Sequence, residues 1–284
     1  MQLIEPRHFT GSSGNRLAAD AGGAPHAPAV VLLHGGGQTR HSWGQAQLDL
    51  IAAGYQVWSV DARGHGESDW VQGGDYALDS QVGDVVAAAR VAGGKPALVG
   101  ASMGGVNAMI ACGADLELAS ALVLVDVTPR LEPDGIAHIT RFMGANLDGF
   151  ASIADAADAV AAYTPSRPRP SSLDGLRKNL RQKEDGRWYW HWDPAMFGGD
   201  GQAKVAAMRE RMLAAADRIQ IPTLLVRGAQ SDMVSMAGVD ELRSHIAHLE
   251  FADIADAGHM IAGDRNDAFN AAVSDFLRRH LPPR

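Results

Sequence analysis

One serine of the sequence lies in a turn built almost entirely of small residues. Residues 100–104 are Gly-Ala-Ser-Met-Gly, directly after the apolar run 97–99 and directly before a segment with helical spacing. A Gly-x-Ser-x-Gly turn between a strand and a helix strains the backbone and exposes the serine hydroxyl at the amino end of the helix. There, the amide of Met103 favours a developing negative charge. The pattern predicts Ser102 as a nucleophile.

A serine hydroxyl is a poor nucleophile at neutral pH unless a base removes its proton as it attacks. Of the eleven histidines, His259 is the best candidate, because it follows a predicted strand and a glycine and precedes the last predicted helix. An imidazole base needs a carboxylate to orient it and to stabilise its charge. Asp232 follows the predicted strand 223–226, and Asp126 follows the predicted strand 121–125. From the residues alone, both remain candidates for the acid.

A run of three glycines follows the apolar segment 29–33, where residues 34–37 are His-Gly-Gly-Gly. Glycines let the backbone approach a substrate closely and direct an amide at an oxyanion. A phosphate-binding loop is a poorer interpretation, because no lysine follows at P-loop spacing and the acidic residue of a dinucleotide site is absent. We expect His34 to pack or hydrogen-bond beneath this loop and His65 to shape the turn at 61–68.

The elements that must position these residues alternate between short apolar runs and longer helical segments, which is typical of a parallel sheet. The expected strands are 29–33, 55–60, 96–100, 121–125, 223–226 and 249–254. The expected helices are 42–53, 79–90, 103–112, 239–246 and 266–279. The first of these strands is apolar throughout, as expected for a strand that is covered on both faces.

The alternation breaks between residues 129 and 219, a region that has helical patches and the aromatic run Arg-Trp-Tyr-Trp-His-Trp at 187–192. We interpret 129–218 as a helical cap inserted between two strands of a core that comprises 1–128 and 219–284. Ligands of open α/β sheets bind at the carboxyl ends of the strands. An insertion at that edge is therefore expected to cover the site.

Four blocks together make the chain resemble the α/β-hydrolase superfamily, from about residue 25 to the C-terminus, with the insertion as the loosest part. They are Leu-Leu-His-Gly-Gly-Gly at 32–37, Asp-Ala-Arg-Gly-His-Gly-Glu-Ser at 61–68, the serine turn at 100–104, and Ala-Gly-His at 257–259. Within the superfamily, the chain is most similar to the esterase and cofactor-free haloperoxidase-like branch. The resemblance implies an α/β fold with a mostly parallel, doubly wound sheet and a cap inserted late in it.

The resemblance also implies a set of roles for the site. The serine turn corresponds to a nucleophile elbow, and the chain order serine, acid, histidine favours Asp232 as the acid of a catalytic triad. Asp126 stays as the alternative acid, because some relatives carry their acid at that position. The oxyanion hole is expected to consist of the backbone amides of Gly36 and Met103.

Apolar side chains near these blocks are candidates for the substrate pocket, because small-molecule sites are mostly apolar. In an extended conformation, the alternating tryptophans of 187–192 share one face, where they line a pocket or anchor the cap to the sheet. The pocket candidates are Trp43, Phe142, Met143, Trp190, Trp192 and Met233.

Composition restricts the partners and the location. The formal charge of −8 disfavours nucleic acid and anionic membranes, which both need a positive surface. No window reaches the roughly 18 apolar residues of a membrane span, and the N-terminus lacks the apolar region of a secretory signal, so we expect a cytoplasmic protein. The single cysteine, Cys112, excludes an internal disulfide. We expect no metal, no cofactor and a small-molecule substrate as the partner, and a homo-oligomer is left open.

The combined prediction is a serine hydrolase that cleaves a small carboxylic ester, apolar in its acyl part, through an acyl-enzyme intermediate. The same residues leave open the hydrolysis of a C–C bond, a lactone or an amide. They also leave open cofactor-free oxygenation by the His/Asp pair, because oxygenating relatives carry their acid where Asp126 lies. A non-catalytic small-molecule receptor is less favoured, since all three triad residue types are present.

Overall fold

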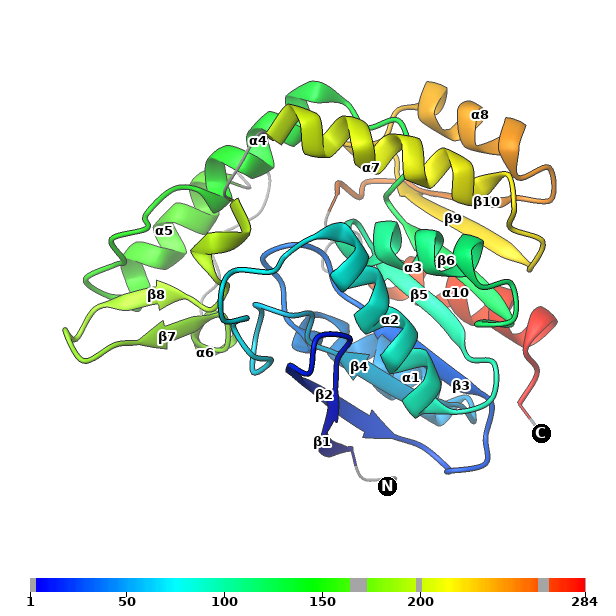
Figure 1. Ribbon diagram of the computed structural model, residues 1–284, viewed down its shortest axis with the longest axis horizontal. Helices are drawn as coiled ribbons and strands as arrows, with labels where there is room; N and C mark the ends of the chain where they lie inside the picture. Colours follow the sequence, from blue (N-terminus) through cyan, green and yellow to red (C-terminus); the bar gives the residue numbers. More distant parts are fainter. Residues whose placement is uncertain (1–3, 164–172, 198–200, 260–265, 284) are drawn as a thin grey trace.

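A single twisted sheet organises the computed structural model, which describes residues 4–163, 173–197, 201–259 and 266–283 (Figure 1). In spatial order, its strands are β1 (Glu5–Thr10), β2 (Arg16–Gly22), β4 (Gln56–Val60), β3 (Ala29–Leu33), β5 (Ala97–Ala101), β6 (Ala121–Val125), β9 (Thr223–Gly228) and β10 (Glu250–Ile254). The strands from β4 to β10 are parallel, whereas β1 and β2 are antiparallel additions at one edge. The predicted fold class is confirmed.

Helices cover both faces of this sheet (Figure 1). One face packs against α1 (Gly44–Ala52) and α10 (Asn266–His280), and the other against α2 (Leu78–Ala92), α3 (Met103–Ala114), α7 (Gly201–Ala216) and α8 (Met236–His245). Successive side chains of a strand point to opposite faces. In β3, Val31 and Leu33 therefore join one apolar cluster, and Val30 and Leu32 join the other. Burial on both faces explains why the strand is apolar throughout.

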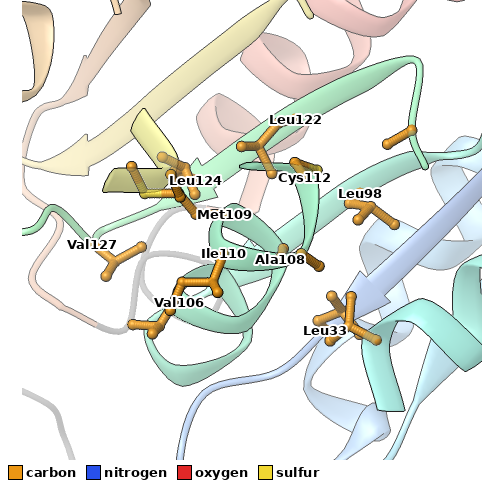
Figure 2. Close-up of a cluster of buried hydrophobic side chains, with 14 of the residues drawn as sticks. Leu33, Leu98, Val106, Ala108, Met109, Ile110, Cys112, Leu122, Leu124 and Val127 are labelled. Carbon is orange, nitrogen blue, oxygen red and sulfur yellow. The ribbon is translucent and has the colours of Figure 1, made fainter. Parts of the chain in front are cut away.

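Helix α3, which follows the serine turn, lies deep in one of these clusters (Figure 2). Leu98 of β5 and Leu122 of β6 are paired in neighbouring strands and lie in one apolar cluster with Met109 of the helix. Burial of each such side chain contributes about 1.5–3 kcal/mol to the stability of the fold. A Cβ at Gly113 would lie 2.5 Å from Ala215, so α7 packs very closely against α3. The helix that begins at the serine is therefore held rigidly on both sides.

Most of the segment between β6 and β9 forms a separate layer over one edge of the sheet (Figure 1). It comprises α4 (Pro133–Met143), α5 (Ile153–Tyr163), α6 (Asp174–Arg177), the hairpin β7 (Leu180–Gln182) and β8 (Trp188–Trp190), the 3₁₀ turn η2 (Pro194–Phe197), and α7. Its own small core includes Met143, Phe150, Leu180, Trp190 and Trp192. The second half of α7 returns to cover the main sheet. The expected cap range of 129–218 thus contains a helix that also serves the core.

Two features of the fold differ from the expected elements. The edge strands β1 and β2 were not expected, and the expected helix at 42–53 is divided into the 3₁₀ turn η1 (Arg40–Trp43) and α1. Five of the six residues of β1 are exposed, so the strand lacks the alternation that reveals a half-buried strand. Within the described ranges, no helix is long and apolar enough to cross a lipid bilayer.

Candidate active site

Ser102 occupies a strained turn between β5 and α3. Its backbone angles are φ 45° and ψ −115°, a conformation that is costly for any residue other than glycine. A Cβ at Gly100 would lie 2.5 Å from the carbonyl oxygen of Gly104, and a Cβ at Gly104 would lie 2.4 Å from that of Leu33. The turn is anchored by the Ser102 amide, which donates to the Val125 carbonyl at 3.0 Å. Both glycines are therefore steric requirements of the turn.

His259 follows β10 and is bound to Asp126. Its Nδ1 lies 2.6 Å from Asp126 Oδ2, and the Asp126 side chain is fully buried. This carboxylate also accepts hydrogen bonds from the amide of Gly228 at 3.1 Å and from the hydroxyl of Ser231 at 2.5 Å. Because the carboxylate accepts at Nδ1, the imidazole carries its proton there and leaves Nε2 with a lone pair. His259 and Ser102 line the same cavity.

The structure does not bring Asp232, the favoured acid, to His259, and this corrects the sequence-based preference. The Asp232 side chain is half exposed, and its Oδ2 lies 3.3 Å from Nδ1 of His138 in the cap. Strand β9 extends to Gly228, two residues beyond the predicted strand end, and the residue of the next loop that reaches the buried carboxylate is Ser231. The alternative acid, Asp126, occupies the position beside the imidazole.

The glycine run after β3 leaves one amide available for an oxyanion. The Gly35 amide donates to Gln38 Oε1 at 3.0 Å, and the Gly37 amide donates to His65 Nε2 at 3.1 Å. For the Gly36 amide between them, the described part of the chain supplies no recorded acceptor, and Gly36 lines the cavity beside Ser102. Because Met103 begins α3, its amide also has no acceptor within the helix.

His34 orients the Gly36 amide. Its Nε2 accepts from the Ala62 amide at 3.0 Å, so its proton lies on Nδ1, which donates to the Gly35 carbonyl at 2.8 Å. The carbonyl and N–H of one trans peptide point in opposite directions. The bond to the Gly35 carbonyl therefore directs the Gly36 N–H away from His34. Sequence reasoning placed His34 beneath this loop but did not identify which atoms it holds.

Three buried histidines surround the glycine run and are held in their neutral forms. Burial lowers the pKa of His34, lowers the pKa of His65 to about 3, and lowers the pKa of His191 well below its usual value. His65 Nε2 accepts from Gly37, so its proton lies on Nδ1 and is donated to the Arg63 carbonyl at 3.1 Å. Each ring thus uses one nitrogen as a donor and the other as an acceptor.

The cavity above Ser102 has a volume of about 520 Å³, which suits a small organic substrate. The six pocket candidates of the sequence all line it: Trp43, Phe142, Met143, Trp190, Trp192 and Met233. Sequence reasoning missed several further lining residues from the core and the cap, among them Gln38, Gln81, Asn107, Tyr163 and Asn179. Their types carry no special signal, and only the fold brings them together.

Aromatic rings form the cap wall of the cavity. Trp190 and Trp192 stack with centroids 4.7 Å apart, and Phe142 and Tyr163 stack at 4.2 Å. A Cβ at Gly37 would lie 3.4 Å from Trp192, so the wall begins directly against the glycine run.

Charge is absent from the described lining, which contains no lysine, arginine, aspartate or glutamate. Burial raises the pKa of Tyr163 to about 12, so its phenol is neutral. Among the residues whose positions are described, no cluster of three histidine, cysteine or acidic side chains could hold a metal ion. The described wall is therefore mostly apolar, with neutral polar side chains such as Gln38, Gln81 and Asn107, and it offers no fixed charge.

Comparison with known proteins identifies the family of the chain. A family model described as the alpha/beta hydrolase fold matches residues 28–265. The chain belongs to the α/β hydrolase fold family. Like its relatives, this α/β hydrolase is an enzyme. It is 29% identical over 260 residues to an esterase of Mycobacterium tuberculosis, covering 88% of this chain and 83% of the relative.

A second relative and one solved structure are also similar to the chain over most of their length. A 3-hydroxybutyrate-oligomer hydrolase of Cupriavidus necator is 27% identical over 257 residues, covering 86% of this hydrolase and 87% of the relative. The crystal structure of E-2-(acetamidomethylene)succinate hydrolase superposes with a TM-score of 0.84 at 21% identity, covering 97% of this chain and 99% of that one. At that identity, the likeness shows the fold alone.

Proposed function

We propose that this hydrolase cleaves small, neutral carboxylic esters by a Ser102–His259–Asp126 triad. The observation that carries the proposal is the buried Asp126 carboxylate, 2.6 Å from His259 Nδ1, beside a serine held at φ 45° on the wall of the same cavity. A serine in this setting is activated for attack on a carbonyl carbon.

The proposed reaction proceeds in two halves. Nε2 of His259 accepts the proton of Ser102 as the hydroxyl oxygen attacks the ester carbonyl, and Asp126 stabilises the imidazolium that results. The amides of Gly36 and Met103 donate to the oxyanion. His259 then protonates the leaving alcohol, the acyl-enzyme forms, and a water molecule activated by the same imidazole releases the acid.

The substrate class follows from the uncharged wall of the cavity. A carboxylate on the substrate would enter a space in which the described lining offers no cation, and an uncompensated buried charge costs about 3–5 kcal/mol. We therefore expect esters whose acyl chain is neutral and apolar. The succinate named for one structural neighbour carries such carboxylates, and this hydrolase is expected to discriminate against substrates of that kind.

The experiment compares p-nitrophenyl hexanoate with the p-nitrophenyl monoester of adipic acid, which has the same chain length and a terminal carboxylate. We expect kcat/KM to favour the neutral ester by at least about 100-fold, in line with the cost of a buried charge. Ser102→Ala should abolish turnover, while the exposed Ser244→Ala should retain it. A fluorophosphonate should label the wild type at Ser102. Full activity in a folded Ser102→Ala protein would refute the triad. Equal rates on the two esters would refute the substrate class.

The bond type is tested with the same variants. A panel of lactones, amides and ring-cleavage diketones compares the other hydrolytic reactions that a serine triad can perform. If the diketone or amide reacted faster than every ester through Ser102, the triad would stand and the assignment to esters would fail.

A second reaction is favoured by the placement of the acid. The resemblance to cofactor-free oxygenating relatives implies an acid after the strand 121–125, where Asp126 stands, and a His/Asp pair that acts as base on a heteroaromatic substrate. Oxygen consumption with N-heteroaromatic substrates tests this alternative. Uptake that survives Ser102→Ala and disappears in His259→Ala would support oxygenation over ester hydrolysis.

A further inference from the structure

The cap segment 191–193, which directly follows β8, contacts the core loop 61–70. The Asp193 amide donates to the Gly64 carbonyl at 2.9 Å, and the indole of Trp70 donates to the His191 carbonyl at 3.1 Å. The hydroxyl of Tyr76 donates to Asp193 Oδ2 at 2.5 Å. The cap therefore contacts the core through directional bonds at this point as well as through apolar packing.

Within this contact, the His191 ring reaches two loops of the core at once. The amide of Gly66 donates to Nδ1 at 2.8 Å, so the proton of the neutral ring lies on Nε2, which donates to the carbonyl of Gly37 at 3.2 Å. The side chain is almost fully buried, and its ring packs edge-on against Trp192 with centroids 5.4 Å apart. The ring is thereby fixed in both position and tautomer.

Gly37 is consequently held on both sides by imidazoles. Its amide donates to His65 of the core, and its carbonyl accepts from His191 of the cap. The two rings lie 5.7 Å apart. The Gly36 amide precedes this clamped residue directly, and glycine at φ 73° has little intrinsic stiffness to hold the loop by itself. The loop that carries the Gly36 amide thus has one support from the cap, in addition to His34 and His65 of the core.

We propose that His191 is a positioning residue that couples the seating of the cap to the geometry of the oxyanion hole, by holding the carbonyl of Gly37. The proposal rests on the proposed function, in which the Gly36 amide binds the oxyanion. When the bond between His191 and the Gly37 carbonyl is lost, the loop moves, and the Gly36 amide shifts away from the oxyanion. The ground state of the ester is bound mainly by the apolar walls, so the loss falls on kcat rather than on KM.

Three substitutions separate the two bonds of the ring. In His191→Asn, an oxygen near the Nδ1 position still accepts from Gly66, but the side chain is too short to reach Gly37. In His191→Gln, a donor amide at about the reach of Nε2 restores the bond to Gly37. His191→Phe removes both bonds and keeps the ring that packs on Trp192.

The matched control is Tyr76→Phe, which removes the bonds of the phenol to Asp193 and to the Val71 amide in the same contact between cap and core, and which does not alter the bonds of Gly37. Loss of an oxyanion donor costs about 10²–10³ in kcat, and a displaced donor costs part of this. We therefore expect kcat on p-nitrophenyl hexanoate to fall about 10- to 100-fold in His191→Asn and His191→Phe, with KM nearly unchanged. His191→Gln should recover most of the rate, and Tyr76→Phe should resemble the wild type.

Inhibition by a trifluoromethyl ketone reports on the oxyanion hole, because the adduct of the ketone with Ser102 carries an oxyanion. A purely structural role of His191 would leave the inhibition constant unchanged. Its inhibition constant should rise in His191→Asn by the same factor by which kcat falls, with thermal unfolding recorded for every variant. Unchanged kcat and inhibition in His191→Asn, or an equal loss in Tyr76→Phe, would overturn the positioning role. If His191→Phe does not fold, the comparison of His191→Asn with His191→Gln is sufficient to test the positioning role. A wild type that is inert to both ester and ketone would instead overturn the proposed function.

Discussion

Replacement of Asp126 by asparagine tests most directly which carboxylate serves His259. The substitution keeps the shape of the side chain, and its oxygen can still accept from the Gly228 amide. The amide nitrogen then faces Nδ1 of His259, 2.6 Å from the present carboxylate oxygen, and donates to it. The imidazole is forced into the tautomer with its proton on Nε2, where it can no longer accept the proton of Ser102.

The size of the effect follows from the buried position of the pair. The Asp126 side chain is fully buried and that of His259 is 12% exposed, so solvent screens the interaction weakly. At an effective dielectric constant of about 20, a carboxylate about 4 Å from the centre of an imidazolium stabilises it by about 4 kcal/mol, or about 10³ in rate. The wrong tautomer adds to this loss, and the same change in other serine triads costs about 10⁴ in kcat.

The assay measures kcat/KM on p-nitrophenyl hexanoate for Asp126→Asn and for the matched control Asp232→Asn. We expect a loss of about 10³–10⁴ for the first variant. We expect a change of no more than about twofold for the second, because Asp232 forms only a half-exposed pair with His138. A large loss in Asp232→Asn beside a small one in folded Asp126→Asn would refute the assignment of the acid.

Two further predictions concern the loops around the nucleophile. Burial lowers the pKa of His65 to about 3, while the unfolded chain binds its proton near pH 6.5, so stability is lost as the pH falls below 6.5. Between pH 6.5 and 4.5, His65 alone should lower the free energy of unfolding, measured by urea titration, by about 2 kcal/mol. In His65→Gln, the free energy of unfolding should therefore depend less steeply on pH. An equally steep dependence in this variant and the wild type would contradict the prediction. Gly104→Ala places a Cβ 2.4 Å from the Leu33 carbonyl oxygen. This substitution should lower the free energy of unfolding by about 1–3 kcal/mol and abolish most of the activity. Gly44→Ala, which meets nothing within 4 Å, is the control, and equal melting temperatures for the two variants would argue against the steric role.

The nucleophile turn could be predicted from the sequence because its physics is local. A buried strand, two glycines and a helix start lie within a few residues of one another, and the close contact of Gly100 with Gly104 follows from that chain geometry. The contact of Gly104 with the Leu33 carbonyl comes instead from the neighbouring strand β3. The position of His259 in the loop after the last strand could be predicted for a similar reason, since the order of strands fixes which loops meet at the carboxyl edge.

The acid could not be chosen from the sequence because both candidates follow neighbouring strands. Val125 of β6 pairs with Val226 of β9, so the loops that carry Asp126 and Asp232 start at the same edge of the sheet. What separates them is the direction of one turn: Asp126 adopts φ 49° and directs its carboxylate to His259. Such a choice depends on tertiary contacts and leaves no mark in residue type or spacing.

The role of His191 was equally hidden from the sequence. Its ring bonds residues that lie 125 and 154 positions away along the chain, and the alternation in the aromatic run 187–192 predicts no contact for it beyond a place on the face opposite the tryptophans. The edge strand β1 was missed because an exposed strand has no alternation of apolar and polar residues. Strand β2 is largely buried, but consecutive small residues such as Ala18 and Ala19 also give no such alternation.

Because Gly37 is held by one histidine of the core and one of the cap, an exchange of caps among these enzymes affects the catalytic loop. The acid is anchored entirely from the sheet side, by Gly228 and Ser231, and would survive a transplanted lid without adjustment. The glycine loop of the oxyanion pocket would be altered, because one of the two imidazoles that hold Gly37 leaves with the old lid. A chimera that imports a new specificity must therefore also carry a donor that reaches Gly37. Without one, the chimera would admit its new substrate and turn it over slowly.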